Sequence, residues 1–293
     1  MVDWQEVGLL TAKVAEFIKP HIKEGASALE IAQAIEEKIF ALGAKPAFPP
    51  NISINSIAAH YTPVWKDSTK FVAEDLVKID FGLRKGLFCS DMAFSVSIGK
   101  NQQNEALIDA ANTALTKAIT KAKSGIMVCE IGKVIETVAK ERGFSVIRNL
   151  TGHGLQEGSL HAEPTIPNFD NGDKTKLCEG QIIAIEPFLT TGKGFVSETE
   201  QYEIFSFIKE KPIRQKEILS FVKAEYGPFP FARRWLIDKF GLLKTNIFIK
   251  EALALNVIKP YKVLKEVSGA KVAQAEHTIR INKNKTEILT SLL

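Results

Sequence analysis

Four carboxylic acids interrupt stretches of the sequence that otherwise read as buried strands. They are Asp80 in VKIDF, Asp91 in CSDMAF, Glu186 in IIAIEPF and Glu276 in VAQAEHTI. Any one of them alone could belong to an edge strand with its carboxylate in water. Because burying a carboxylate without a partner is costly, four in such surroundings predict a shared compensating charge, which a divalent metal ion supplies.

A histidine between two glycines is a plausible nitrogen ligand to join them. His153 lies in LTGHG, which we expect to form a turn after a strand at 145–149, where flanking glycines let the backbone approach closely. A lone histidine in such a turn is usually a surface residue, so this prediction depends on the four carboxylates. Two aspartates, two glutamates and one histidine suit Mn, Fe, Co or Zn. Four carboxylates exceed what one ion needs, so we expect two divalent ions.

The motifs of several other enzyme classes are missing from the sequence. It contains no HExxH, GxSxG, GxxxxGK(S/T) or GxGxxG. Zincin, α/β-hydrolase, P-loop and simple Rossmann interpretations therefore lack their motifs.

An internal repeat organises the chain. Residues 23–43 and 123–143 align without a gap, and seven of their 21 positions are identical. Both segments carry apolar residues at helical spacing and close on a glycine. Each follows another helical stretch, at roughly 4–23 and 104–123. The repeat predicts two helix–helix–strand halves related by a pseudo-twofold axis.

The repeat also pairs residues that carry chemistry. His60 in AAHYTP faces His161 in LHAEP, and farther on Asp80 faces Glu186. Each histidine taken singly is more often structural, but their equivalent places favour a functional role. A site between the two halves would receive similar groups from each.

The segments outside the repeat predict strands. Residues 77–98 predict two strands around a turn at 84–86, and residues 181–204 predict a second pair around 191–194, because apolar, β-branched runs flank glycine-containing turns.

A segment of different character interrupts the second half. Residues 206–262 are basic, helical and rich in aromatic residues, whereas 270–282 return to strand-like sequence. We therefore predict an α+β protein with a central antiparallel sheet. Its main domain would comprise 1–205 and 263–293, and 206–262 would form an inserted helical subdomain.

Composition excludes several classes of protein. Of 293 residues, 45% are hydrophobic and 25% are charged, as in globular proteins. The formal net charge of +4 is too small to indicate nucleic-acid or membrane binding. The three cysteines lie far apart, and no basic-then-apolar leader opens the sequence. We therefore expect a cytoplasmic monomer with its cysteines in the core and with neither DNA nor a membrane as partner.

Taken together, these segments resemble the type 2 methionine aminopeptidase family, the archaeal and eukaryotic branch with the pita-bread fold. The resemblance covers nearly the whole chain, and the absence of a long basic extension points to the archaeal branch. The matching motifs are AFP at 47–49, SIN at 53–55, AAHYTP at 58–63, KIDFG at 78–82, DMAFS at 91–95, GH at 152–153, LHA at 160–162, AIE at 184–186, RRWL at 233–236 and EHTI at 276–279.

The resemblance implies a dinuclear metal centre with two divalent ions (Co, Mn, Fe or Zn). Asp91 and Glu276 would bridge the ions. The full ligand set would be Asp80, Asp91, His153, Glu186 and Glu276.

The resemblance also implies the substrate contacts. His60 and His161 would contact the substrate near the scissile bond, Glu186 would carry a proton to the leaving amine, and Phe48 would line the methionine pocket. The implied activity is removal of the N-terminal initiator methionine from nascent proteins when the next residue is small, by attack of a hydroxide held between the two ions.

Three positions depart from the pattern of the family. Gly158 replaces an aromatic residue, Glu163 a small one, and Ala275 an aromatic one. These departures concern the shape of the pocket and leave the ligand set intact.

Two alternatives remain open on the sequence. A dipeptidase of the prolidase or creatinase type shares the fold and ligands, but it carries an N-terminal domain for which the chain before Asp80 leaves no room. A relative that binds RNA or ribosomes without catalysis should show a broken ligand set, and all five positions are intact.

The charge of the inserted segment bears on which partner its surface could bind. Between Lys209 and Lys250 there are ten Lys or Arg and four Asp or Glu, a local charge of 10 − 4 = +6. Most charged faces are simply solvated. The sharper hypothesis is that this face meets the ribosome surface near emerging chains.

Overall fold

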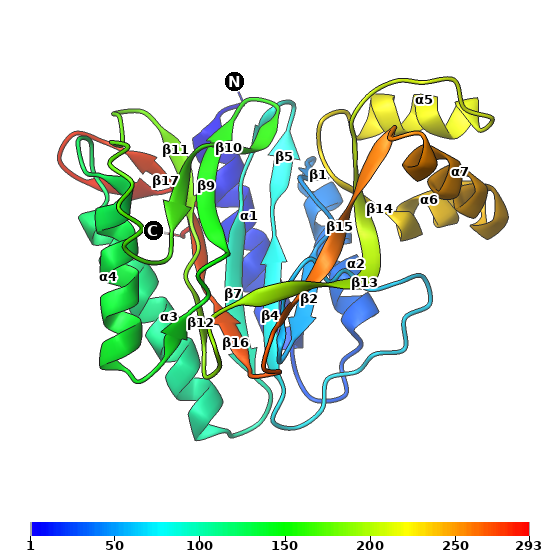
Figure 1. Ribbon diagram of the computed structural model, residues 1–293. Helices are drawn as coiled ribbons and strands as arrows, with labels where there is room; N and C mark the ends of the chain where they lie inside the picture. Colours follow the sequence, from blue (N-terminus) through cyan, green and yellow to red (C-terminus); the bar gives the residue numbers. More distant parts are fainter. Residues whose placement is uncertain (1, 293) are drawn as a thin grey trace.

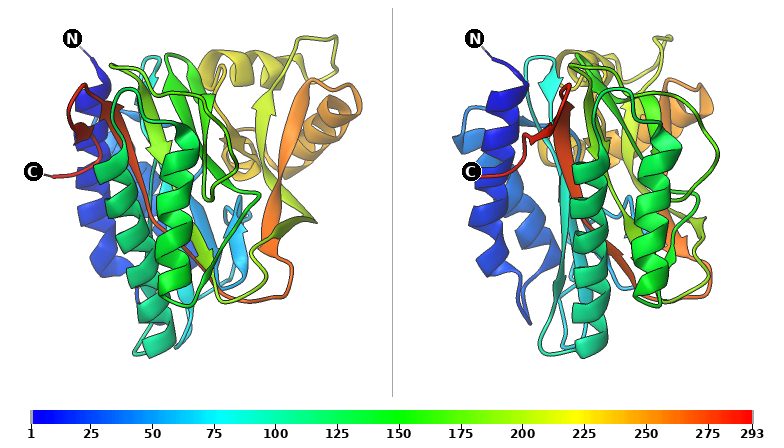
Figure 2. Two further views of the ribbon diagram at one scale, coloured as in Figure 1. Left: turned by 60° about the vertical axis from the view of Figure 1, so that its left-hand side comes forward. Right: turned by 90° about the vertical axis from the view of Figure 1, so that its left-hand side faces the viewer.

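Two pairs of helices cover one side of the molecule. In the computed structural model, which describes residues 2–292, the first pair is α1 (Trp4–Ile18) and α2 (Ala28–Ala41), joined by a 3₁₀ turn at Lys19–His21. The second pair is α3 (Gln102–Lys121) and α4 (Val128–Glu141). Figure 2 shows the two pairs next to each other, as the internal repeat predicts.

The repeated helices α2 and α4 end in the same way but begin with different caps. The Ser27 hydroxyl caps α2 by accepting from the Glu30 N–H, whereas the Glu130 carboxylate at α4 accepts from the Met127 N–H. Each helix is followed by a glycine with a left-handed backbone, Gly43 and Gly143. Short-range sequence signals therefore set both boundaries.

An eight-stranded antiparallel sheet lies beneath these helices. Its order is β10-β9-β11-β17-β7-β4-β2, with β18 paired to β17. The strands are β2 (Asn51–Ile54), β4 (Leu76–Phe81), β7 (Met92–Ser97), β9 (Thr151–Gln156), β10 (Ser159–Pro167), β11 (Ile182–Ile185), β17 (Glu276–Ile281) and β18 (Thr286–Ile288). The predicted α+β pita-bread fold with a pseudo-twofold repeat is confirmed.

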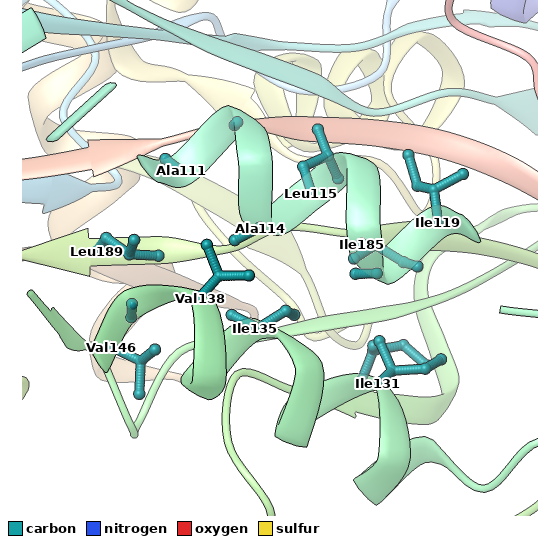
Figure 3. Packing of buried hydrophobic residues seen from close by; sticks show 14 of the residues in the cluster. Ala111, Ala114, Leu115, Ile119, Ile131, Ile135, Val138, Val146, Ile185 and Leu189 are labelled. Atoms are coloured by element: carbon teal, nitrogen blue, oxygen red, sulfur yellow. The ribbon is translucent and has the colours of Figure 1, made fainter. Parts of the chain in front are cut away.

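Each half of the sheet has its own hydrophobic core. Helices α1 and α2 pack on β2, β4 and β7, and helices α3 and α4 pack on β11, β17 and their neighbours. Figure 3 shows Leu115 of α3 and Ile135 of α4 gathered with Ile185 and Leu189 of the strands. Two separate cores hold the two halves of the sheet in fixed positions.

Three small sheets complete the fold. They are β1-β5-β6, β16-β12-β8 and β14-β13-β15-β3. The strands are β1 (Lys45–Pro46), β3 (Ile57–Ala59), β5 (Leu83–Lys85), β6 (Phe88–Cys89), β8 (Ser145–Val146), β12 (Phe188–Thr190), β13 (Val196–Phe207), β14 (Phe231–Ala232), β15 (Ile258–Glu266) and β16 (Val272–Gln274).

Two sequence predictions are wrong here. Residues 181–204 form no hairpin, because β12 pairs with β8 and β16 while β13 pairs with β14 and β15. These partners are distant in sequence, so local turn signals did not reveal them. Cys178 is exposed in the loop before β11, whereas Cys89 and Cys129 are buried as expected.

The inserted helices lie between β13 and β15. They are α5 (Lys216–Glu225), α6 (Arg233–Phe240) and α7 (Leu242–Ala254), and Figure 1 shows them at the end of the β13–β15 ribbon, on the side opposite to α3 and α4. Because β13 runs to Phe207 and β15 begins at Ile258, both ends of the predicted insertion are strand. The division at 205 and 263 stays a prediction.

A buried ion pair fastens the insertion to the first half. The Arg234 guanidinium donates to the Glu36 carboxylate on α2 and to the Thr62 hydroxyl, and the Trp235 indole also donates to Glu36. Both charged side chains are almost fully buried, so removing either one would leave an uncompensated charge. No helix within residues 2–292 is long and apolar enough to span a membrane.

Candidate metal centre

Strand register brings three of the predicted carboxylates together. Ala93 on β7 pairs with Asp80 on β4 and with Glu276 on β17. Residues directly opposite each other project from the same face of a sheet, and Asp91, just before β7, shares that face by alternation along the chain. The small side chain of Ala93 leaves room between the carboxylates.

The second half adds the remaining two residues to the same face. Thr278, which shares a face with Glu276, pairs with Ala184 on β11. Ala184 in turn pairs with His153 on β9 and precedes Glu186 by two residues. Ala184 thus occupies the same kind of position as Ala93: in each half, an alanine lies between the residues that carry the site groups.

The distances show how closely these groups approach. His153 Nε2 lies 3.5 Å from Asp91 Oδ2 and 3.8 Å from Glu186 Oε1. One possible ligand atom from each of Asp91, His153 and Glu276 lies within 4.8 Å of the others. Such separations suit groups that share an ion, because metal–ligand distances are about 2.0–2.2 Å. With Nδ1 protonated and donating to the Gly154 carbonyl at 3.2 Å, Nε2 of His153 keeps its lone pair for a ligand.

The charges at this site lack compensation within the protein. Burial, followed by repulsion from neighbouring carboxylates, raises the pKa values of Asp80, Glu186 and Glu276 well above their usual range. In the described part of the chain, Asp80 Oδ1, Asp91 Oδ1 and Glu276 Oε1 are buried and have no hydrogen-bond partner. Buried oxygens without donors are what a divalent cation satisfies, so the residues fit a metal.

The predicted turn around His153 is wrong. His153 lies inside β9, and β8 before it spans only Ser145–Val146. The flanking glycines serve a different purpose, because a Cβ on Gly152 would lie 2.3 Å from the Ala184 carbonyl oxygen and one on Gly154 would lie 2.2 Å from that of Glu163. They allow β9 to pass between its two neighbouring strands.

A cavity of about 200 Å³ opens over this face. It is lined by all five predicted ligands together with Phe48, His60 and His161. None of the three departures, Gly158, Glu163 and Ala275, is among the described residues that line it. The structure therefore brings every residue singled out for the site to one place.

The two histidines at the cavity are held differently. His60 has a left-handed backbone, its Nδ1 lies 3.1 Å from the Lys262 carbonyl, and burial lowers its pKa. His161 reaches the surface at the cavity mouth, but the surrounding protein and then the imidazole of His153, with ring centres 4.5 Å apart, lower its pKa as well. Both rings are neutral at neutral pH.

Three residues at the site were not found by sequence reasoning. The Gln274 amide lies 3.4 Å from both Glu186 Oε2 and Glu276 Oε2. The Thr278 hydroxyl accepts from the Asp91 N–H at 2.8 Å and donates to its carbonyl at 2.7 Å. Tyr261 packs edge-on against His60, with ring centres 5.5 Å apart. Gln274 and Thr278 alternate with Glu276 along the chain, a pattern visible in the sequence, whereas Tyr261 lies in the basic segment, where no site residue was expected.

This fold and this carboxylate–histidine cluster define a metal-dependent hydrolase. The sequence model of metallopeptidase family M24 matches residues 4–223. The chain belongs to metallopeptidase family M24.

Individual relatives agree with this assignment. A methionine aminopeptidase of Archaeoglobus fulgidus is 41% identical over 288 residues, which is 97% of this chain and 96% of the relative. The structure of a methionine aminopeptidase from Thermotoga maritima matches with a TM-score of 0.74 at 23% identity and covers 98% of this chain and 95% of that one. A thermophilic Arx1 matches with a TM-score of 0.82 at 17% identity, covering 99% and 90%. The two structures bear on the fold alone.

Replacing Glu276 with glutamine should have opposite effects with and without metal. In metal-free protein, Glu276→Gln removes a repelling charge at nearly constant volume, so the thermal midpoint should equal or exceed that of the parent. Co²⁺ binding, measured by calorimetry, should weaken at least about tenfold, since loss of even an outer-shell partner commonly costs that much. Glu37→Gln, at an exposed position on α2, serves as the control. Equal Co²⁺ affinity in the Glu276 variant and the parent would remove Glu276 from the ligand set.

Proposed function

We propose that this chain is a methionine aminopeptidase that removes the N-terminal methionine from nascent proteins when the next residue is small. The observation that carries the proposal is the gathering of five ligand-type residues, two further imidazoles and a buried phenylalanine around one cavity. A relative named methionine aminopeptidase is 41% identical over 97% of this chain, and this likeness supports the substrate. Aminopeptidase action in the cytoplasm, on emerging chains, follows from that substrate.

Two divalent ions are the proposed cofactors, drawn from Co, Mn, Fe or Zn. Four carboxylates and one imidazole exceed the needs of a single ion, and Asp91 and Glu276, central in the cluster, are the proposed bridging ligands. The ions would supply Lewis acidity and an attacking water with a lowered pKa. His153, Asp80 and Glu186 would complete the ligand set.

The protein's own groups would handle the remaining steps. Glu186, at the end of β11, would take the proton from the attacking water and deliver it to the leaving amine. With its Nδ1 proton donated to the Lys262 carbonyl, the neutral His60 ring presents Nε2 as an acceptor for the scissile N–H. His161 is free to donate to the developing oxyanion. Phe48, which is almost fully buried, would form the wall of an apolar pocket that selects an unbranched thioether.

Peptide hydrolysis tests this proposal. Chelated protein should be inactive and should release methionine from Met-Ala-Ser once Co²⁺ or Mn²⁺ is restored. A Leu-Pro dipeptide should remain intact, because it carries no N-terminal methionine. A dipeptidase of the prolidase type would cleave it. Cleavage of Leu-Pro without release of methionine would favour that alternative, and inactivity on both peptides despite bound metal would favour a non-catalytic relative.

The two cavity histidines give a sharper prediction. His60→Ala and His161→Ala should each lower kcat by about 10²–10³-fold, the usual cost of losing a positioned hydrogen-bonding group. Bound metal should stay at the parental level, because neither residue is a proposed ligand. His21→Ala, a surface substitution on the first helical pair, should change neither quantity. Metal loss in proportion to activity would place the two imidazoles among the ligands.

The ribosome surface is the proposed partner of the inserted subdomain. Several of its basic residues are neutralised locally, since Lys223 pairs with Glu210 and Arg233 with Glu203. Lys209, Arg214 and Lys216 remain exposed at the start of the subdomain. Lys239, Lys244 and Lys250 of the subdomain are exposed as well, but 209–216 holds four basic residues within eight positions. Counterion release on contact with RNA would favour binding at such a segment.

Charge reversal tests this partner. Changing Lys209, Lys211, Arg214 and Lys216 to Glu should abolish co-sedimentation with ribosomes and leave Met-Ala-Ser turnover unchanged. The matched control reverses four exposed lysines on distant loops: Lys174, Lys176, Lys283 and Lys285. If the two variants co-sediment with ribosomes to the same extent, the residues at 209–216 form no specific contact and are a simply solvated surface.

A further inference from the structure

A lysine amine lies inside the protein next to the proposed metal centre. Lys78 is fully buried in β4 and precedes Asp80 by two residues, so both side chains leave the same face of the strand. Its Nζ donates to the Asn55 carbonyl at 3.0 Å and to the Val272 carbonyl at 2.9 Å. Burial lowers the pKa of this amine to about 7, because a buried charge is costly, so the presence of a lysine here calls for a physical reason.

The Lys78 amine is bound by main-chain carbonyls instead of a carboxylate. The nearby Asp75 carboxylate is engaged elsewhere, accepting from the Asn55 side-chain amide at 2.8 Å and from the Val72 N–H at 2.9 Å. Within the described residues, the hydrogen bonds of Lys78 Nζ go to carbonyls of two other segments. The lysine thus acts as a cross-link between backbones.

Each of these carbonyls belongs to a segment that carries a site residue. Asn55 forms the left-handed turn between β2 and β3, and β3 leads directly into His60. Val272 begins β16, which runs through Gln274 into Glu276. The Lys78 cross-link therefore joins the supports of His60 and Glu276 to the strand that bears Asp80.

A second fastening acts on the same segment from a neighbouring strand. Ser95 on β7 is the direct partner of Lys78 across the sheet. Its hydroxyl donates to the Gln274 carbonyl at 2.7 Å and accepts from the Gln274 N–H at 2.9 Å. Side chains on one face of β4 and β7 thus hydrogen-bond to β16 at two points. Side chains that only filled space in the core would not need these hydrogen bonds.

We propose that Lys78 is a positioning residue that clamps the β2–β3 turn and β16 to β4 and so fixes Asp80, His60 and Glu276 relative to one another. The clamp joins two groups of the first half, Asp80 and His60, to Glu276 on the segment that follows the insertion. This role rests on the proposed metal centre and aminopeptidase function.

Lys78→Met tests the clamp, because methionine keeps the length and apolar stem of lysine but donates no hydrogen bond. Co²⁺ binding by calorimetry and kcat on Met-Ala-Ser should both fall by about 10–100-fold, as for outer-shell partners of metal ligands. The thermal midpoint of the metal-free protein is measured in parallel. A purely structural lysine would lower that midpoint and leave Co²⁺ affinity and kcat of the folded protein at parental values, and this result would overturn the proposal.

Lys271→Met is the matched control. Lys271 is the neighbour of Val272, and its Nζ also donates to a main-chain carbonyl, that of Glu74 at 2.6 Å, and to Asn104 Oδ1 at 3.0 Å. It fastens β16 toward α3, away from the ligands, so Co²⁺ affinity should stay within about twofold of the parent, inside the usual scatter for substitutions remote from a site. An equal loss in both variants would show that any weakening of β16 suffices and would overturn the specific role of Lys78.

A second variant covers the case in which Lys78→Met does not fold. Lys78→Ala is prepared with propylammonium, which replaces the removed atoms. Co²⁺ affinity that rises with propylammonium concentration supports the clamp, and affinity independent of the amine overturns it. Failure of the parent protein itself to bind Co²⁺ would instead contradict the proposed function.

Discussion

The crowding of like charges on one face of the sheet is the constraint on which this structure depends. Asp80, Asp91, Glu186 and Glu276 line one cavity together with the imidazole of His153, and the Gln274 amide lies 3.4 Å from both Glu186 and Glu276. Burial and mutual repulsion raise the pKa values of three of them, so the metal-free site opposes folding. The remainder of the fold must hold these groups together until a cation compensates them.

The duplicated architecture provides that restraint. Each half places a pair of helices over its own strands, and two separate hydrophobic cores result. Neither half can move away from the other without disturbing β17, which pairs with β7 of the first half and β11 of the second. Alanines at the two crossing points, Ala93 and Ala184, leave the ligands space on the open face. The repulsion is thus opposed by apolar burial elsewhere, a common arrangement at functional sites.

The inserted segment completes the site from outside the repeat. Its following strand, β15, contributes Tyr261 against His60 and the carbonyl that orients that imidazole. The buried Arg234–Glu36 pair ties its helices to α2. Because this pair also touches Thr62, close after His60 in the chain, the insertion is braced against the segment that carries one of the proposed substrate-binding groups. It therefore helps to shape the cavity, whatever its exposed charges bind.

The sequence alone determined the helix ends, the candidate ligands and the repeat. Glycines marked the ends of the two repeated helices, apolar surroundings showed which carboxylates were out of place in strands, and the repeat placed His60 opposite His161. The resemblance then indicated the family and the ligand set. The glycines and the apolar runs act within a few residues, where backbone geometry leaves few choices, whereas the repeat and the resemblance compare whole segments of the sequence.

Only the tertiary structure decided which distant strands pair, and that pairing created the rest. The hairpin predicted for 181–204 failed because β12 and β13 find partners far along the chain. His153 proved to be a strand residue because Gly152 and Gly154 admit the backbones of β11 and β10. Gln274, Tyr261 and the buried Lys78 acquire their contacts from segments remote in sequence. Strand pairing depends on the summed packing of the whole sheet, so no local pattern specifies it.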